Sequence, residues 1–356
     1  MTGPLAVVDA QARTLAPSYF ALVMATGIVS ISAHQLGVGV VDVGLFAFNI
    51  VAYVVLVLLT AVRLTRHWSA FVADLTDHRR APGFLTAVAG TCVLGAQMVL
   101  IADSLTIATG LLIAGGVLWV VLIYTIFTAL TIKPDKPSLA DGISGSWLLA
   151  VVATQSIAVL VALLSAHWEQ PLRLHANFVA LSMWLWGGML YIWIISLIFY
   201  RYAFFRFSPA DLAPPYWINM GAMAISALAG SLLIVDAPAA PFLDSLRPFL
   251  EGFTVFYWAT GTWWIPMIAI LAVWRYGVRR LPLTYDPLYW GAVFPLGMYA
   301  VATFKMADAM PLGFLDFIPD VFFWIALAAW ILAFTGLVGS LSKTLARRRP
   351  GEGDSA

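Results

Sequence analysis

A short segment near the end of the chain carries the side chains with the clearest chemical potential. Pro295 lacks the N–H that would bond to the carbonyl of Gly291, so a helix through this segment is predicted to kink. Phe294 and Lys305 recur at helical spacing on one face, which places a phenyl ring near the kink and an ammonium farther along. If this face borders a water-filled path, the ring would close the path and the ammonium would attract anions. Otherwise Phe294 is a packed aromatic, and Lys305 extends to the membrane interface or pairs with an aspartate that follows it.

Hydroxyl and amide side chains recur within several other apolar stretches. Such groups can donate hydrogen bonds to an anion without carrying a charge, and polar groups at membrane depth usually face a cavity or another helix. We expect them to line the same path as Lys305, and they are Thr26, Ser30, Gln97, Gln155, Ser226 and Thr303. The alternative is ordinary packing between helices that approach closely through small residues.

Three titratable side chains lie near the ends of apolar stretches. Glu251 and Asp320 fall in the first turn of predicted helices, where a carboxylate either complements the helix terminus or takes part in proton transfer. His34 titrates near neutral pH when unperturbed and is a third candidate for a proton-linked group, the alternative being a hydrogen-bonded interfacial histidine. The sequence shows no nucleophile–base pair, metal-ligand cluster or phosphate-binding glycine loop. We therefore expect no enzyme activity, no metal and no cofactor.

The composition indicates which elements must position these side chains. The 356 residues are 62% hydrophobic and only 10% charged, with a mean hydropathy of +0.91, which exceeds what a soluble chain can bury. A membrane-crossing helix needs roughly 20 apolar residues. Ten stretches meet this need, and they are 17–35, 40–62, 83–102, 105–130, 147–165, 177–200, 216–235, 249–274, 287–304 and 317–340. We therefore predict an all-α integral membrane protein with an N-terminal segment (1–16), a ten-helix membrane domain (17–340) and a basic tail (341–356).

The distribution of basic residues predicts the orientation. With the N-terminus inside, the predicted cytoplasmic segments hold 16 of the 19 lysines and arginines, and the outer loops hold three. An even number of spans then makes both termini cytoplasmic, and we expect a multi-pass protein of the plasma or inner membrane. The formal net charge of +1 shows no overall basic bias, so a nucleic-acid partner is not expected.

The predicted spans alternate in composition. The odd-numbered spans begin near 17, 83, 147, 216 and 287, at intervals of roughly 64 to 71 residues, which indicates a repeated unit. The first four of these contain few aromatic and many small residues, whereas the even-numbered spans are strongly aromatic. Small residues allow close approach or leave room for a pore, and bulky aromatics fill space against neighbours and lipid. We predict five parallel helical hairpins with the odd-numbered helices around a central pore.

Three segments of the sequence carry a resemblance to a known family. They are FALVMATGIVS at 20–30, WINMGAMAISALAG at 217–230, and Trp290 with the Phe294-Pro295 and Ala302-Thr303 pairs ahead of Lys305. In these segments the chain resembles the tellurite-resistance and dicarboxylate transporter family, which includes fungal malate and sulfite permeases and plant guard-cell slow anion channels. The resemblance implies five hairpins around a pore, a homotrimer, and Phe294 as the pore-occluding phenylalanine. Ala25 stands where many members carry glycine, a small-for-small change.

Together these features predict a channel or uniporter for small inorganic or organic anions, with small anions and the lipid bilayer as partners. The alternative is a proton-coupled transporter of malate-type C4-dicarboxylates, or a sulfite transporter. An arginine pair that could hold a dicarboxylate in a bidentate manner is missing from the predicted spans, which weakens the malate alternative.

Overall fold

The computed structural model describes residues 4–209, 211–282 and 284–346. These residues form helices joined by turns and short loops, without a strand, which confirms the predicted all-helical membrane class. Within the described chain, nine helical stretches are long and apolar enough to cross a membrane. A further 20-residue helix, Trp290–Ala309, is not among the nine. Whether this helix is the tenth span stays a prediction.

Five helices form the centre of the molecule, and we call them the inner helices. They are α2 (Ala21–Gln35), α5 (Leu85–Leu100), α8 (Leu149–Ser165), α10 (Ile218–Asp236) and α13 (Trp290–Ala309). Each packs against the next in this order, and α13 packs against α2, so the five close into a ring. In the first four, 78–94% of the positions of the spanning segment are buried. Almost every residue of α13 up to Thr303 is buried as well.

Five longer helices surround this ring, and we call them the outer helices. They are α3 (Gly39–Arg66), α6 (Leu105–Ile132), α9 (Leu172–Phe204), α12 (Arg247–Ala272) and α14 (Phe317–Ala346). Each packs against the inner helix that precedes it in the chain. Only 22–39% of the positions of their spanning segments are buried, because their aromatic and aliphatic side chains cover the outside of the molecule. The alternation of small and aromatic spans therefore matches the division into inner and outer helices.

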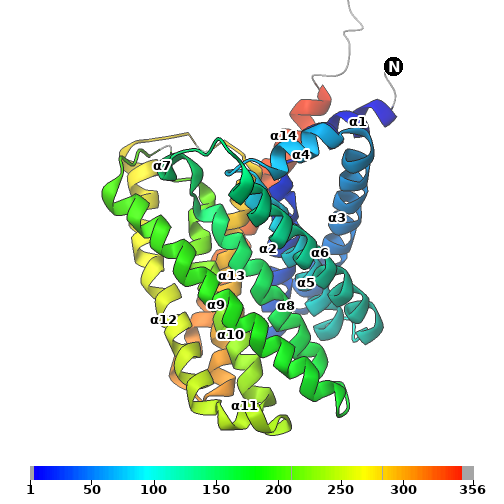
Figure 1. The fold of residues 1–356 in the computed structure, drawn as a ribbon, viewed down its shortest axis with the longest axis vertical. Helices are drawn as coiled ribbons and strands as arrows, with labels where there is room; N and C mark the ends of the chain where they lie inside the picture. The colour runs from blue at the N-terminus through cyan, green and yellow to red at the C-terminus, as the bar shows by residue number, and fades with distance from the viewer. Residues whose placement is uncertain (1–3, 210, 283, 347–356) are drawn as a thin grey trace, which may run out of the picture.

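Short helices mark the two ends of the ring. Figure 1 shows α1 (Pro4–Thr14), α4 (Trp68–Leu75) and α7 (Leu139–Gly142) at one end, and α11 (Pro241–Ser245) at the other. We call these two ends the α7 end and the α11 end. The short helices α4 and α7 each precede an inner helix, so the inner helices run from the α7 end to the α11 end. The described part of the chain starts and finishes at the α7 end (Figure 1).

A 3₁₀ turn precedes every inner helix. The five turns are Pro17–Phe20, Ala81–Phe84, Gly145–Leu148, Pro214–Trp217 and Pro287–Tyr289. Four of them have proline at the first or second position, where its fixed φ favours helix initiation and its missing N–H costs nothing. Each turn contacts the next, and the last contacts the first, so the turns form their own closed ring at the α7 end.

Candidate functional site

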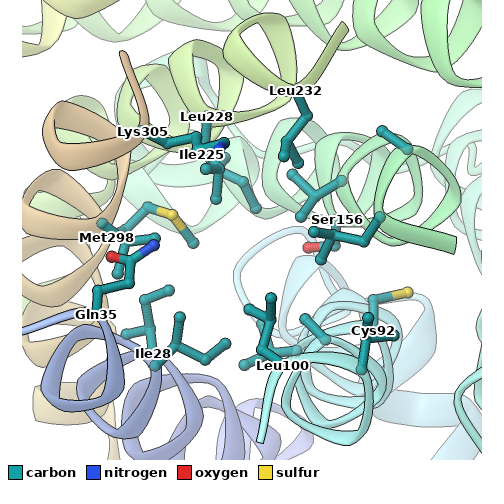
Figure 2. Close-up of a pocket in the computed structure, with 18 of the residues that line it drawn as sticks. Ile28, Gln35, Cys92, Leu100, Ser156, Ile225, Leu228, Leu232, Met298 and Lys305 are labelled. Atoms are coloured by element: carbon teal, nitrogen blue, oxygen red, sulfur yellow. The ribbon is translucent and has the colours of Figure 1, made fainter. Parts of the chain in front are cut away.

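The inner helices enclose a cavity in the half of the ring nearer the α11 end. Its volume is about 280 Å³, and all five inner helices contribute side chains to its wall. Figure 2 shows Ile28, Leu100, Leu228 and Leu232 around its open centre. Most of the wall is aliphatic, and Ser156 supplies a hydroxyl deep inside, where it donates to the carbonyl of Val152 (2.7 Å). The cavity can therefore admit a small solute but offers it few hydrogen bonds along most of its depth.

Polar side chains gather where the inner helices end. Gln35, His167, Asp236 and Lys305 border this mouth of the cavity. The ammonium of Lys305 lies 2.8 Å from a carboxylate oxygen of Asp308, whose side chain is 61% exposed. Lys305 therefore borders the cavity and also forms the ion pair that was the alternative; its role in a pore stays a prediction. The salt bridge lies on the solvent side of the mouth.

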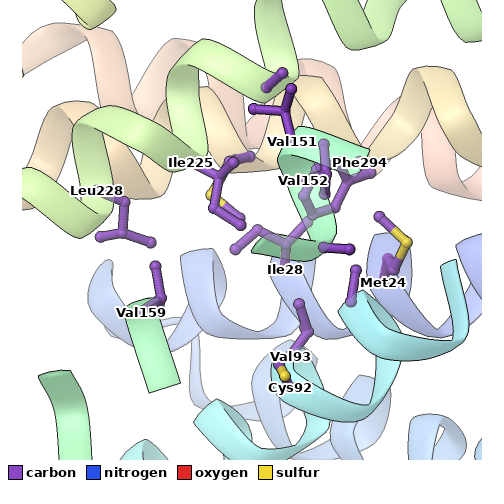
Figure 3. Packing of buried hydrophobic residues seen from close by; sticks show 14 of the residues in the cluster. Met24, Ile28, Cys92, Val93, Val151, Val152, Val159, Ile225, Leu228 and Phe294 are labelled. Carbon is purple, nitrogen blue, oxygen red and sulfur yellow. The ribbon is translucent and has the colours of Figure 1, made fainter. Parts of the chain in front are cut away.

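The cavity ends against a closed apolar layer that contains Phe294. Phe294 lies one helical turn before Met298, which borders the cavity, and its side chain is only 1% exposed. Figure 3 shows it in the buried cluster with Met24, Ile28 and Val152, which come from α2 and α8. The ring of inner helices is therefore filled by side chains at this level.

Pro295 lies inside α13, beside the closed layer. It packs against Gly221 of α10, where an added Cβ would lie 2.7 Å from the Cγ of the proline. Gly291, whose carbonyl the proline nitrogen cannot bond, is buried in the first turn of the same helix. The missing side chain at Gly221 allows α10 and α13 to approach closely around the proline.

Three residues expected to line the path instead accept hydrogen bonds from tryptophans of outer helices, two through the hydroxyl and one through the backbone carbonyl. The indole N–H of Trp330 donates to Thr26 (2.9 Å), and that of Trp258 donates to Thr303 (2.9 Å). Ser226 donates its own hydroxyl to Ala222, while its carbonyl accepts from the indole of Trp184 (2.9 Å). These side chains do not border the cavity.

The same contact occurs at all five outer helices. The indole N–H of Trp119 donates to the hydroxyl of Thr154 (2.9 Å). The hydroxyl of Tyr53 lies 3.0 Å from that of Thr91, and Tyr53 is the donor because the Thr91 hydroxyl donates its own hydrogen to the carbonyl of Ala87. Each aromatic bonds to the inner helix of the following hairpin unit, and α14 bonds back to α2. We call these five hydrogen bonds the aromatic hoop; its donors are Tyr53, Trp119, Trp184, Trp258 and Trp330. The hoop directs inner-helix polar groups outward, which leaves the cavity wall apolar.

The other three predicted lining residues also contact outer helices. Ser30 donates to the carbonyl of Asp42 (2.8 Å). Gln97 accepts from the amide of Asn49 (2.7 Å), and Gln155 donates to the carbonyl of Trp184 (3.0 Å). Seven residues were expected to attract anions or to line the path, and among the described residues only Lys305 of these seven borders the cavity.

The candidates for a proton-linked group lie away from the cavity. His34 is 2.9 Å from the carboxylate of Asp42 at the α11 end. Glu251 pairs with Arg247 (3.0 Å) on the outer helix α12, and Asp320 is exposed on α14. Among the acidic side chains of the described chain, Asp236 alone borders the cavity. Sequence reasoning missed it, although a carboxylate directly after the predicted span 216–235 was a usable signal.

Charged side chains surround a depression at the α7 end. A depression of about 340 Å³ lies beside the ring of 3₁₀ turns, and Arg79, Arg80 and Asp286 border it. Arg80 also lies 2.7 Å from Asp74. Burial, followed by the positive charge of Lys133, lowers the pKa of the neighbouring His78. Arg79 in turn lies 3.6 Å from Asp141, so both arginines beside this depression are paired with aspartates.

Comparison with known proteins connects this arrangement with membrane transport. The sequence profile of the voltage-dependent anion channel family matches residues 14–338. The chain belongs to this family. The match confirms the family expected from the sequence, and it makes this protein a member of a family of multi-pass anion transport proteins.

Individual relatives cover different shares of the chain. An uncharacterized membrane protein of Mycobacterium tuberculosis is 38% identical over 160 residues, which span 44% of this chain and 80% of that protein. Two uncharacterized transporters of Methanocaldococcus jannaschii are 26% and 25% identical over 90% and 88% of this chain, and each match covers 91% of the relative.

Proposed function

We propose that the protein is a passive channel or uniporter for small anions. The observation that carries this proposal is the closed ring of five inner helices around a cavity that stops at the apolar layer of Phe294. A cavity with one closed end is the form expected of a pore in a non-conducting state. The family and the relatives named as transporters support the same class of function.

In this proposal the chain crosses the membrane ten times as five hairpins, and α13 is the ninth of the ten spans. The α7 end is cytoplasmic, so both termini are cytoplasmic, in keeping with the concentration of basic residues in the predicted inner segments. The protein resides in the plasma or inner membrane as the homotrimer that the family resemblance implies.

Phe294 is the proposed gate. Phe294 lies one helical turn before Met298, which borders the cavity, and it belongs to the same buried apolar cluster as Met24, Ile28 and Val152. A narrow apolar neck excludes ions by its size and by excluding water. In this proposal, displacement of the Phe294 ring extends the cavity toward the α7 end.

Three features favour anions over cations. Lys305 places an ammonium at the α11 mouth, and Arg79 and Arg80 place guanidinium groups, each paired with an aspartate, at the α7 mouth. All five inner helices begin at the α7 end, so their positive N-terminal ends converge there. These fields raise the local concentration of anions at both mouths.

Flux through reconstituted protein tests the proposal. Purified protein in liposomes should pass chloride and nitrate down their gradients at equal pH on both sides, with sulfite and malate as further test anions. Uptake only in the presence of a pH gradient would favour the proton-coupled alternative. Absence of flux for every anion from correctly inserted protein would refute the proposal.

A further inference from the structure

The carboxylate of Asp236 lies where a negative charge should hinder anions. Asp236 is the last residue of α10, its side chain is 4% exposed, and it borders the mouth of the cavity. A carboxylate in a weakly hydrated wall acts over several ångströms, because little water screens it. An anion path past this residue therefore requires a compensating charge.

Arg173 of α9 supplies that charge. Its Nη2 lies 2.5 Å from Oδ1 of Asp236, while the hydroxyl of Ser165 on α8 donates to Oδ2 (2.7 Å). Both carboxylate oxygens are thus bonded. The guanidinium is more exposed than the carboxylate, at 27% against 4%, so Arg173 covers Asp236 from the solvent side.

The other charged side chains at the mouth do not compensate Asp236 when Arg173 is absent. Lys305 borders the same mouth, but exposed Asp308 partly offsets its charge, and His167 contributes only when protonated. If Arg173 is removed, Asp236 is left uncompensated and the mouth becomes more negative by one unit charge. Of the two side chains, Asp236 borders the cavity, so the pair is placed where it sets the charge of the cavity wall.

We propose that Arg173 is a specificity-determining residue, which makes the α11 mouth passable to anions by neutralising Asp236. The inference rests on the proposed anion pathway. It predicts that the two side chains act as opposites: loss of Arg173 hinders anions, loss of Asp236 favours them, and loss of both returns the mouth close to its original state.

Charged thiol reagents measure the sign of the mouth without relying on transport. In a Cys92→Ala background, Leu232→Cys places a thiol on the cavity wall, one turn before Asp236 (Figure 2). The readout is the ratio of labelling rates by a sulfonate and a trimethylammonium methanethiosulfonate. Arg173→Gln should lower this ratio by about tenfold or more, and Asp236→Asn should raise it. Arg173→Lys, which keeps the charge, should leave the ratio near that of the parent.

The double variant separates electrostatic from structural roles. Arg173→Gln/Asp236→Asn should recover the parental ratio, and the anion flux of the same variants in liposomes should follow the same order. An unchanged ratio in a folded Arg173→Gln variant, or no recovery in the double variant, would overturn the inference. If Arg173→Gln does not fold, an unchanged ratio in Asp236→Asn overturns it. A ratio that responds in protein that passes no anion would refute the proposed function and leave the electrostatic role standing.

Discussion

The two halves of the inner ring are built from the same five helices but differ in what fills them. Toward the α11 end the helices surround a cavity of about 280 Å³ with an aliphatic wall and a charged mouth. Toward the α7 end the 3₁₀ turns touch one another, and Phe294 completes a closed layer. The contrast shows that the α11 half of the ring leaves space between its helices, whereas the α7 half is packed.

The largest effect is expected where the two halves meet. Phe294→Ala should raise anion flux by about tenfold or more, equivalent to a barrier lowered by about 1.4 kcal/mol, because the layer loses its largest side chain. The measurement is anion flux into liposomes together with thermal unfolding of the purified protein. Faster flux would show that the Phe294 side chain is the barrier to anions in the packed half of the ring.

Phe323→Ala is the matched control. Phe323 is fully buried on the outer helix α14, so the same truncation creates a cavity outside the ring. Both variants should lose about 3–5 kcal/mol of stability, but only Phe294→Ala should gain flux. Unchanged or reduced flux in a folded Phe294→Ala variant would show that the ring is core packing and not a gate.

The rigidity of the α7 half can be tested at Gly145. A Cβ at this position would lie 2.4 Å from the carbonyl oxygen of Pro215 and 2.8 Å from the Cα of Tyr216, which are backbone atoms of the neighbouring turn. Gly145→Ala should therefore destabilise the protein by about 1–3 kcal/mol or more, measured by thermal unfolding in detergent. Gly110→Ala in the interior of α6 meets no atom within 4 Å and should be neutral or stabilising by about 0.5–1 kcal/mol. Equal stability of the two variants would mean that the turns can separate easily.

The charged mouth of the α11 half predicts a salt-dependent effect. Lys305→Gln should lower anion flux by up to about tenfold at low ionic strength, because the field of the ammonium is lost. Near 1 M salt the difference should shrink, since the screening length falls to about 3 Å. Asp308→Asn keeps the ammonium and removes its partner (2.8 Å), so it should preserve flux. An equal loss at both salt levels in both variants would assign a purely structural role to the pair.

The smallest effect is expected at the aromatic hoop. Thr303→Val removes the acceptor for the indole of Trp258 and should cost about 0.5–1.5 kcal/mol without changing the order of anion permeabilities. Trp258→Phe removes the donor, and the double variant should be less destabilised than the sum of the two changes. An altered permeability order in a Thr303→Val protein of normal stability would mean that the hydroxyl faces the path after all.

The sequence by itself determined the class of the protein and the division of its helices. The count of apolar stretches and their alternating composition follow from the length of a membrane span and from the space that small and aromatic side chains occupy. Lys305 and the Phe294-Pro295 pair were recognisable because a charge or a proline is exceptional in an apolar helix. The family segments in 20–30, 217–230 and 290–305 pointed the same way.

Only the tertiary structure decided which side of each inner helix faces the cavity. An outer helix has one buried face and one lipid-facing face. Four inner helices are instead buried nearly all round, and they are α2, α5, α8 and α10. Their sequences therefore contain no polar stripe from which the rotation of each helix about its own axis could be predicted. The sequence identifies three polar residues within membrane spans, Thr26, Thr303 and Ser226. It does not show whether they face a path or a tryptophan, because the tryptophan that bonds to each comes from a helix remote in sequence. The pairing of Asp236 with Arg173 likewise joins helices whose contact residues are 63 positions apart. Hydrogen bonds between helices determined this rotation because, inside a membrane protein, hydrophobicity favours no one face of a fully buried helix.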